Sequence, residues 1–323
     1  MKYKCCKFIQ NGINLHLFGI RFCNKLGIGP ILTDRINDSK IDFDSIEKKR
    51  REIIENCKNN VLPESCENCE WLEDKEWDSV DEITEVEISN WTHCNCSCIY
   101  CSNIEFTKGF YSNKIRPSEY FDAYPILKNL ANKKLINHKT NFCFVGGEPT
   151  VLKEFPKIVD LLIKIKANHF SILTSGILYS KAIEKALKYS NLVVCISIDA
   201  GSRETYQKLK RVDKFDEIVK NLKKYKKSTK NTDDKLELKY IIIDGINDNE
   251  EEIKKWLDLT SELGIKRASV SIEFCHSARK KAGSLIPQKY YDLNAFAIEY
   301  GTNLGLQVYP FSFFEMLMQR GHY

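Results

Sequence analysis

The stretch Trp91-Thr-His-Cys94-Asn-Cys96-Ser-Cys98-Ile-Tyr100-Cys101 carries the clearest chemical signal in this chain of 323 residues. Three of its cysteines, Cys94, Cys98 and Cys101, follow a Cys-x3-Cys-x2-Cys spacing. Three thiolates from one loop can each ligate an iron of a [4Fe-4S] cube, which leaves the fourth iron without a protein ligand. An open coordination position is where a metal site binds its substrate. The stretch therefore predicts a catalytic iron–sulfur cluster, in which Cys96 has no place.

A four-cysteine zinc site is the alternative interpretation of this region. The pairs Cys66-x2-Cys69 and Cys98-x2-Cys101 have the spacing of its two halves. That interpretation leaves Cys94 out, and it does not account for the glycine motif that follows.

Around this loop, short apolar runs alternate with longer amphipathic ones. Runs rich in β-branched residues predict six strands, over 86–91, 141–145, 170–174, 192–199, 236–243 and 268–274. Apolar residues spaced three and four apart predict five helices, over 118–130, 152–166, 181–188, 215–225 and 250–263. The alternation predicts an α/β fold with a parallel sheet, whose chemistry lies at the carboxyl ends of the strands.

A second motif, Gly146-Gly147-Glu148-Pro149, lies at the end of the second predicted strand. Paired glycines let a backbone approach a ligand closely, and exposed carbonyls and Glu148 can accept hydrogen bonds from an ammonium group. Alone, the motif could be an ordinary strand-to-helix turn. It begins 45 residues after Cys101, one β/α unit later, and this position makes it a stronger signal.

Together these residues resemble the radical S-adenosylmethionine (SAM) superfamily, over nearly all of residues 86–274. The resemblance implies a partial (β/α)6 barrel, like part of a TIM barrel. It also implies that SAM chelates the open iron and is cut there to a 5′-deoxyadenosyl radical. The SAM contacts that it implies are Tyr100, Gly146, Gly147, Glu148, Pro149, Thr174, Ser175, Ser197, Asp199, Lys210 and Arg211.

Weaker parts of the resemblance lie further along the chain. Thr174-Ser175-Gly176 is similar to a Thr-Asn-Gly turn of the family, with Ser175 in place of the asparagine. The motif from Ser197 to Ala200, followed by Glu204-Thr205-Tyr206, resembles the fourth-strand motif of the family, which often contacts the ribose and carboxylate of SAM. In the subgroup of the superfamily that this chain resembles, a basic residue about a dozen positions past the fourth strand can meet the carboxylate of SAM. Lys210 or Arg211 matches that position.

The first 85 residues hold six cysteines, one predicted helix over 46–54 and few strand-like runs, so we expect a separate small unit whose core needs a metal. It resembles the auxiliary-cluster modules called SPASM or Twitch, although those usually follow the radical SAM domain. The resemblance implies a second iron–sulfur cluster, and Cys5 or Cys57 could replace Cys6 in its ligand set. A structural zinc is the alternative. The expected ligands are Cys6, Cys23, Cys66 and Cys69.

The expected domains are a cysteine-rich unit over 1–85, a partial barrel over 86–285 and a helical extension over 286–323. With 49 basic and 44 acidic residues, the net charge of +5 fits a solvated surface better than a nucleic-acid site. No signal peptide and no apolar run long enough to span a bilayer is visible, so we expect a cytoplasmic protein.

We expect a radical SAM enzyme that takes electrons from a low-potential donor such as ferredoxin or flavodoxin. The substrate class rests on resemblance alone, which favours a peptide or protein over a sugar or nucleotide. Two other classes remain as alternatives. One is a non-catalytic iron–sulfur protein that transfers electrons or senses redox state, and the other is a zinc-held interaction module.

Overall fold

The computed structural model describes residues 2–17, 19–23, 43–67, 69, 71–77, 82–101, 121–189, 191–229, 235–272 and 287–310. The chain divides into two compact units, residues 1–93 with 117–171 and residues 94–116 with 172–323. Strand β7 (His169–Thr174) begins in the first unit and ends in the second. Cys275 and the aromatic tail 311–323 lie outside the described residues.

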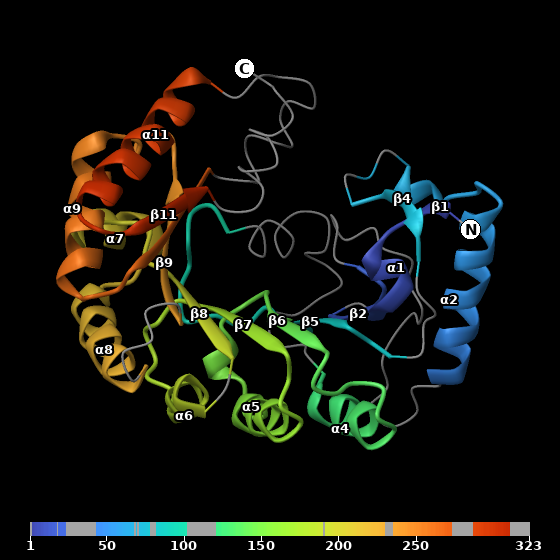
Figure 1. Cartoon of the computed structure of the whole chain (residues 1–323). Coiled ribbons are helices and arrows are strands. Elements are labelled where there is room, and N and C mark those ends of the chain that lie inside the picture. Colours follow the sequence, from blue (N-terminus) through green and yellow to red (C-terminus); the bar gives the residue numbers. More distant parts are fainter. Residues whose placement is uncertain are drawn as a thin grey trace. The chain divides into compact units, whose positions relative to one another are not determined.

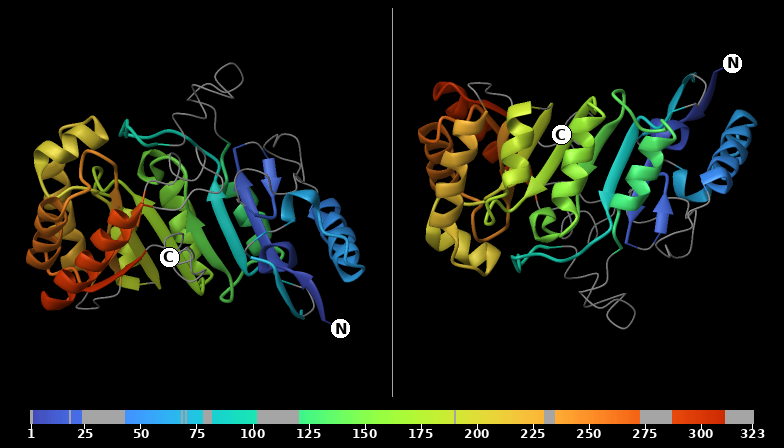
Figure 2. Two further views of the ribbon diagram at one scale, coloured as in Figure 1. Left: turned by 90° about the horizontal axis from the view of Figure 1, so that it is seen from above. Right: turned by 90° about the horizontal axis from the view of Figure 1, so that it is seen from below.

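The first unit is built on parallel strands. Strand β5 (Glu85–Ser89) pairs in parallel with β6 (Asn141–Phe144) on one side and with β2 (Gly12–His16) on the other. Strand β3 (Gly19–Arg21) pairs antiparallel with β2. Helices α4 (Tyr124–Asn132) and α5 (Phe155–Lys164) lie side by side against this unit (Figures 1 and 2). Each begins with a proline in its first turn, where the missing N–H costs nothing.

The second unit repeats the pattern with strands β7, β8 (Leu192–Ser197), β9 (Leu236–Ile242), β10 (Arg267–Ile272) and β11 (Gln307–Pro310) in that order. Strands β8 to β11 pair in parallel. Its helices are α6 (Lys181–Tyr189), α7 (Arg203–Lys210), α8 (Phe215–Ser228), α9 (Glu250–Glu262) and α11 (Gln288–Asn303). Helices α8, α9 and α11 lie along the outside of the strands (Figure 1). Tyr240 on β9 packs on Trp256 of α9, with ring centroids 5.0 Å apart.

The predicted α/β class with parallel strands is confirmed, and the six predicted strands and four of the five predicted helices form with small shifts of their ends. The helix predicted over 118–130 begins only at Tyr124, and residues 118–120 of that prediction lie outside the described residues. Two elements that the pattern did not predict, α7 and β11, also form. Strand β11 pairs with β10, so the segment after residue 286 contributes a strand as well as the predicted helix.

The amino-terminal segment has more strands than expected. Strand β1 (Lys2–Cys5) pairs antiparallel with β4 (Glu73–Glu76), while β2 and β3 lie in the same sheet as β5. The expectation of few strands was wrong, because strands of three to five residues are too short to show a period of two. Helix α1 (Lys7–Asn11), helix α2 (Phe43–Lys58) and a 3-10 turn (Glu64–Cys66) complete the segment. The domain boundaries at 85 and 285 stay a prediction.

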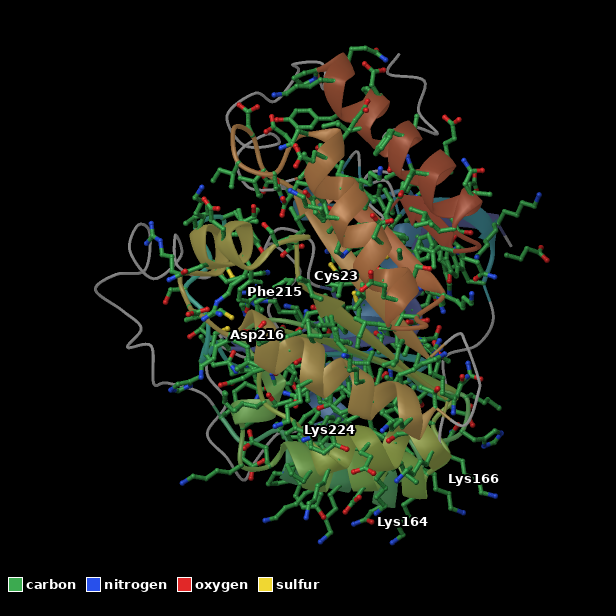
Figure 3. The ribbon with its side chains drawn as sticks, turned by 90° about the vertical axis from the view of Figure 1, so that its left-hand side faces the viewer. Cys23, Lys164, Lys166, Phe215, Asp216 and Lys224 are labelled. Atoms are coloured by element: carbon green, nitrogen blue, oxygen red, sulfur yellow. The ribbon has the colours of Figure 1, made fainter. Side chains whose placement is uncertain are left out.

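Surface lysines follow the outer faces of the helices in both units. In the first unit Lys164 and Lys166, at the end of α5, project away from the ribbon (Figure 3). In the second unit Lys224 on α8 is exposed, and its ammonium lies 4.8 Å from the centre of the Tyr179 ring. Such scattered charges are typical of a solvated surface. Among the described residues, no helix combines the length and the apolar character that a membrane span requires.

Arg50 fastens α2 to the chain before it. Its side chain is fully buried, and its guanidinium donates to the carbonyls of Ile9 at 2.7 Å and Gly12 at 2.8 Å. The guanidinium carbon also lies 4.6 Å from the centre of the Phe22 ring. A buried cation is tolerated only when its hydrogen bonds are satisfied, and here backbone carbonyls and the Glu47 carboxylate, 3.2 Å from Nε, satisfy them. This contact joins α2 to α1 and β2.

We predict that Arg50→Met lowers the free energy of unfolding of the metal-free chain by about 3–5 kcal/mol, because each buried acceptor left unpaired costs about 1–3 kcal/mol. Arg51, the next residue on α2, is exposed, and Arg51→Met should change stability by less than about 0.5 kcal/mol. Urea unfolding of both variants is the measurement. Equal stability of the two would show that Arg50 does not hold the segment.

Candidate functional site

The cysteine loop is anchored to the end of α7 in the second unit. The backbone N–H of Ser97 donates to the carbonyl of Lys210 at 3.1 Å, and that of Ile99 donates to the carbonyl of Leu209 at 3.0 Å. The last carbonyls of a helix have no partner within the helix, so they are available as acceptors. The loop therefore has a defined backbone at the positions between its cysteines, and the Cys101 N–H closes a turn on the Cys98 carbonyl at 3.1 Å.

The thiols of Cys94, Cys96 and Cys98 lie near one another. Cys96 is close enough to hydrogen-bond with the thiols of both Cys94 and Cys98, and this raises the pKa of Cys96. The same hydrogen bond from Cys96, together with the positive charge of Lys210, lowers the pKa of Cys98 to about 6. Cys98 is therefore a thiolate at neutral pH, and the thiolate is the form that binds metals.

Tyr100, Asp199 and Lys210 form a buried network in the second unit. The Lys210 ammonium pairs with Oδ2 of Asp199 and donates to the Tyr100 hydroxyl at 2.5 Å, and that hydroxyl donates to the same Asp199 oxygen. Asp199 is fully buried and Lys210 is 3% exposed. Burial alone would lower the pKa of Lys210, but the charges of Asp199 and Cys98 outweigh it and raise that pKa. The lysine therefore stays charged.

The backbone at Asp199 is held in a conformation that few residues adopt. Its φ angle is +60°, in the left-handed region. The backbone N–H of Ile241 donates to Oδ1 of Asp199 at 2.8 Å, and Nδ2 of Asn247 donates to the Asp199 carbonyl at 2.8 Å. Both carboxylate oxygens and the carbonyl are thus engaged, which fixes the direction in which the side chain points.

The Gly-Gly-Glu-Pro motif lies in the first unit, against the segment that leads into the cysteine loop. The Gly147 N–H donates to the carbonyl of Trp91 at 3.3 Å, and the Glu148 N–H donates to that of His93 at 2.7 Å. A Cβ on Gly147 would lie 2.1 Å from the His93 carbonyl oxygen. The close approach made possible by Gly147 is therefore made to the chain itself.

Glu148 and Pro149 are both buried, and Glu148 is only 2% exposed. Oε1 of Glu148 accepts hydrogen bonds from the backbone N–H of Thr150 at 3.1 Å and from its hydroxyl at 2.5 Å. The carboxylate therefore caps the turn that follows it. Gly146, by contrast, is exposed and has a φ of +124°, where a side chain would be strained.

The remaining predicted SAM contacts lie at the ends of strands β7 and β8 and at the end of helix α7. The Ser175 hydroxyl donates to Oδ1 of Asn95 at 3.0 Å, which joins the turn after β7 to the cysteine loop. Thr174 is buried and its hydroxyl accepts from the Gly176 N–H at 3.1 Å. Ser197 is partly buried beside Lys239 of β9. Arg211, the left-handed residue that ends α7, is exposed.

The buried amide donor Nδ2 of Asn95, in the cysteine loop, has no protein acceptor among the described residues. The hydroxyl of Tyr206 on α7 lies within hydrogen-bonding reach of the Cys96 thiol, and burial followed by the charge of Cys96 raises the pKa of that tyrosine. Buried donors are rarely left unsatisfied. Donors beside a set of thiols suit an anionic group such as a thiolate-ligated cluster, so the residues present fit an iron–sulfur cluster.

A single metal ion fits less well. Thiolates that share one zinc each lie about 2.3 Å from the same point. Among the described residues, no three side chains of His, Cys, Asp or Glu are arranged to hold one ion. A [4Fe-4S] cube takes each thiolate on a different iron, so its ligands stand further apart.

Four of the amino-terminal cysteines, Cys5, Cys6, Cys57 and Cys66, are buried in the first unit. Cys5 and Cys57 are fully buried and hydrogen-bonded to each other, and Cys57 also lies within the electrostatic influence of Cys66 and Cys6. The Cys6 thiol accepts from the Ile9 N–H at 3.5 Å, which caps α1, and burial raises its pKa to about 12.

Of the other expected ligands of the second cluster, Cys66 is buried, while Cys23 and Cys69 are partly exposed. The backbone N–H of Cys69 donates to the Cys66 carbonyl at 3.1 Å, so the two form one turn.

The sequence did not identify Asn95, nor the place of Tyr206 beside Cys96, nor the role of Asn247 in holding Asp199. Asn95 was overlooked because it is one of the spacer residues between cysteines. Tyr206 lies on α7, whose start carries a recognisable signal. Ser202 caps the helix by accepting from the Thr205 N–H at 3.3 Å, and Glu204 lies in its first turn.

The chain is similar to known proteins both in sequence and in fold. The radical SAM superfamily model matches residues 90–277, more than half of the chain. A GTPase Obg of Brachyspira hyodysenteriae is 27% identical over 214 residues, which are 62% of this chain and 30% of that protein. A GTP 3′,8-cyclase of Clostridium botulinum is 26% identical over 195 residues, 60% of this chain and 56% of the cyclase.

Among solved structures, Streptococcus suis SuiB bound to precursor peptide SuiA matches with a TM-score of 0.55 and 18% identity, covering 88% of this chain and 58% of SuiB. At this identity the likeness shows the fold alone. This chain spans less than two thirds of the length of each of these three proteins. Because the superfamily model covers more than half of its length, the chain belongs to the radical SAM superfamily, whose enzymes use a [4Fe-4S] cluster and SAM.

Proposed function

We propose that this enzyme cleaves SAM reductively at a cluster held by Cys94, Cys98 and Cys101. The observation that carries the proposal is the cysteine loop itself. Its backbone is pinned to α7 at Ser97 and Ile99, and the buried Nδ2 of Asn95 within it has no acceptor among the described residues. The three thiolates would hold three irons of the cluster, which would leave the fourth iron for the amine and carboxylate of SAM.

The cofactors supply the difficult chemistry, and the protein orients them. When bound, the cluster supplies one electron that breaks the bond from sulfur to C5′ of SAM, which releases methionine and a 5′-deoxyadenosyl radical that takes a hydrogen atom from the substrate. Cys98 favours its thiolate form near neutral pH, so it can bind iron readily. Thr150 orients the Glu148 carboxylate through two hydrogen bonds, and we assign this carboxylate to the SAM ammonium.

The proposed substrate is a peptide or protein. The fold of this chain is similar to that of SuiB, whose structure contains a precursor peptide. A nucleotide is the second candidate, because GTP 3′,8-cyclases match about 60% of the sequence. The rate of 5′-deoxyadenosine release separates the two. A nucleotide substrate predicts that GTP accelerates release at least about tenfold, whereas a peptide substrate predicts no effect of GTP.

We further propose a second cluster in the amino-terminal segment, with Cys6, Cys23, Cys66 and Cys69 as its ligands. The support is the turn that joins Cys66 to Cys69 and the gathering of other thiols in the interior of the first unit. Both clusters require electrons of low potential, so a cytoplasmic ferredoxin or flavodoxin is the proposed donor.

We predict that the protein, reconstituted anaerobically and reduced with dithionite, releases 5′-deoxyadenosine from SAM. The triple variant Cys94→Ala, Cys98→Ala, Cys101→Ala should release none, because it lacks the three ligands of the cluster. Cys96→Ala is the matched control in the same loop and should keep both iron and product. Equal product from the triple variant and the unaltered protein would disprove the assignment.

The amino-terminal cluster predicts that the triple variant still binds about four irons with sulfide. Further replacement of Cys66 and Cys69 by alanine should remove that iron. Cys195→Ala, at a buried cysteine on β8, should leave the iron content unchanged. One zinc per chain without sulfide would instead identify a structural metal.

For Glu148 we predict that Glu148→Gln weakens SAM binding by about ten- to a hundredfold. A hydrogen bond to a charged partner contributes about 1.5–3 kcal/mol, and each 1.4 kcal/mol is about tenfold. Iron content and thermal unfolding should stay near those of the unaltered protein. Glu154→Gln is the control, since Glu154 is also buried and lies six residues further on. Unchanged SAM affinity, or loss of the cluster, would assign Glu148 a structural role.

A further inference from the structure

Tyr206, Leu209 and Lys210 of helix α7 make contacts with four residues of the cysteine loop. The carbonyls of Lys210 and Leu209 accept from the N–H groups of Ser97 and Ile99. The other two contacts are made by side chains. The Tyr206 hydroxyl lies beside Cys96, and the Lys210 ammonium bonds to the Tyr100 hydroxyl at 2.5 Å. One short helix therefore contacts the loop continuously from Cys96 to Tyr100.

Lys210 is poorly placed to serve as the basic residue that meets the carboxylate of SAM. It is 3% exposed, and its ammonium already bonds to both Asp199 and Tyr100. Turning this ammonium towards a ligand would leave the fully buried Asp199 carboxylate without its counter-ion, which is strongly unfavourable. Arg211, the neighbouring candidate, has no such commitment and is exposed.

We propose that Lys210 is a positioning residue, which acts through Asp199 and Tyr100 to hold the cysteine loop in the form that accepts the cluster. The inference rests on the proposed function, because it takes Cys94, Cys98 and Cys101 as the cluster ligands. Tyr100 lies between Cys98 and Cys101, so fixing its hydroxyl fixes the backbone that separates these two ligands. The carboxylate of Asp199 is itself fixed by the Ile241 N–H, so the network is tied to β9.

The test compares four variants of the full chain. Lys210→Met removes the charge and keeps the length, Lys210→Arg keeps the charge, and Tyr100→Phe removes only the hydroxyl. Lys208→Met is the matched control, because Lys208 lies on the same helix, is 63% exposed and pairs with Glu204. The readouts are amide hydrogen exchange at Ser97 and Ile99 before and after reconstitution, iron and sulfide content, the EPR spectrum of the reduced cluster without SAM, and SAM affinity.

A positioning role predicts that Lys210→Met raises the exchange rate at Ser97 and Ile99 by about tenfold or more, already in the iron-free chain, because these amides are protected by the α7 carbonyls. Iron content should fall and the EPR signal without SAM should change. Tyr100→Phe should show a smaller shift in exchange of about threefold. Lys210→Arg should restore most of the protection, and Lys208→Met should match the unaltered protein.

A direct role at SAM predicts a different pattern. Exchange, iron content and the EPR spectrum without SAM would be unchanged in Lys210→Met, and only SAM affinity would fall, by about tenfold. That result would overturn the inference while leaving the proposed function intact. Failure of the unaltered protein to bind iron with sulfide would instead overturn the proposed function. If Lys210→Met does not fold, Tyr100→Phe decides, since unchanged exchange in that variant contradicts the inference.

Discussion

The carboxylate of Asp199 is the contact on which the arrangement of the second unit's site depends. One of its oxygens accepts from the backbone of β9, and the other is shared by Lys210 and Tyr100. A buried ion pair contributes little net stability unless every remaining hydrogen-bonding group is satisfied. Here Asn247 satisfies the Asp199 carbonyl, and the left-handed backbone aims the carboxylate at its partners. Strand, helix and cysteine loop thus meet at one charged group.

Much of this arrangement could be predicted from the sequence. The spacing of Cys94, Cys98 and Cys101 and the alternation of apolar runs each report local chemistry, and the α/β class followed from them. The pairing of Lys210 with Tyr100 could not be predicted, because it joins residues 110 positions apart through a helix that ends in an unusual left-handed residue. The sequence shows that Lys210 is basic, but only the structure shows that it is buried and paired with Asp199.

Gly147 shows a different kind of limit. The sequence correctly marked it as a place of close backbone approach, yet the nearest atom to its missing Cβ is the carbonyl oxygen of His93. The sequence indicates that another group approaches Gly147 closely, but only the structure identifies that group as the His93 carbonyl. In the same way, the six cysteines before residue 85 predicted thiol chemistry in that segment, while the strands β2 and β3 that share its sheet were too short to recognise.

The length of α7 has a consequence for how the chain can vary. An α-helix turns by about 100° per residue, so one residue added or removed between Ser202 and Lys210 would rotate the lysine away from Asp199. Both ends of the segment are fixed, since Glu252 on α9 accepts from the Ser202 N–H at 3.0 Å and the last carbonyls hold the cysteine loop. Helix α7 therefore cannot shift along its axis to compensate for an added or removed residue. Natural variants should keep the count of residues from Ser202 to Lys210 constant, even where the identities of the exposed ones change freely.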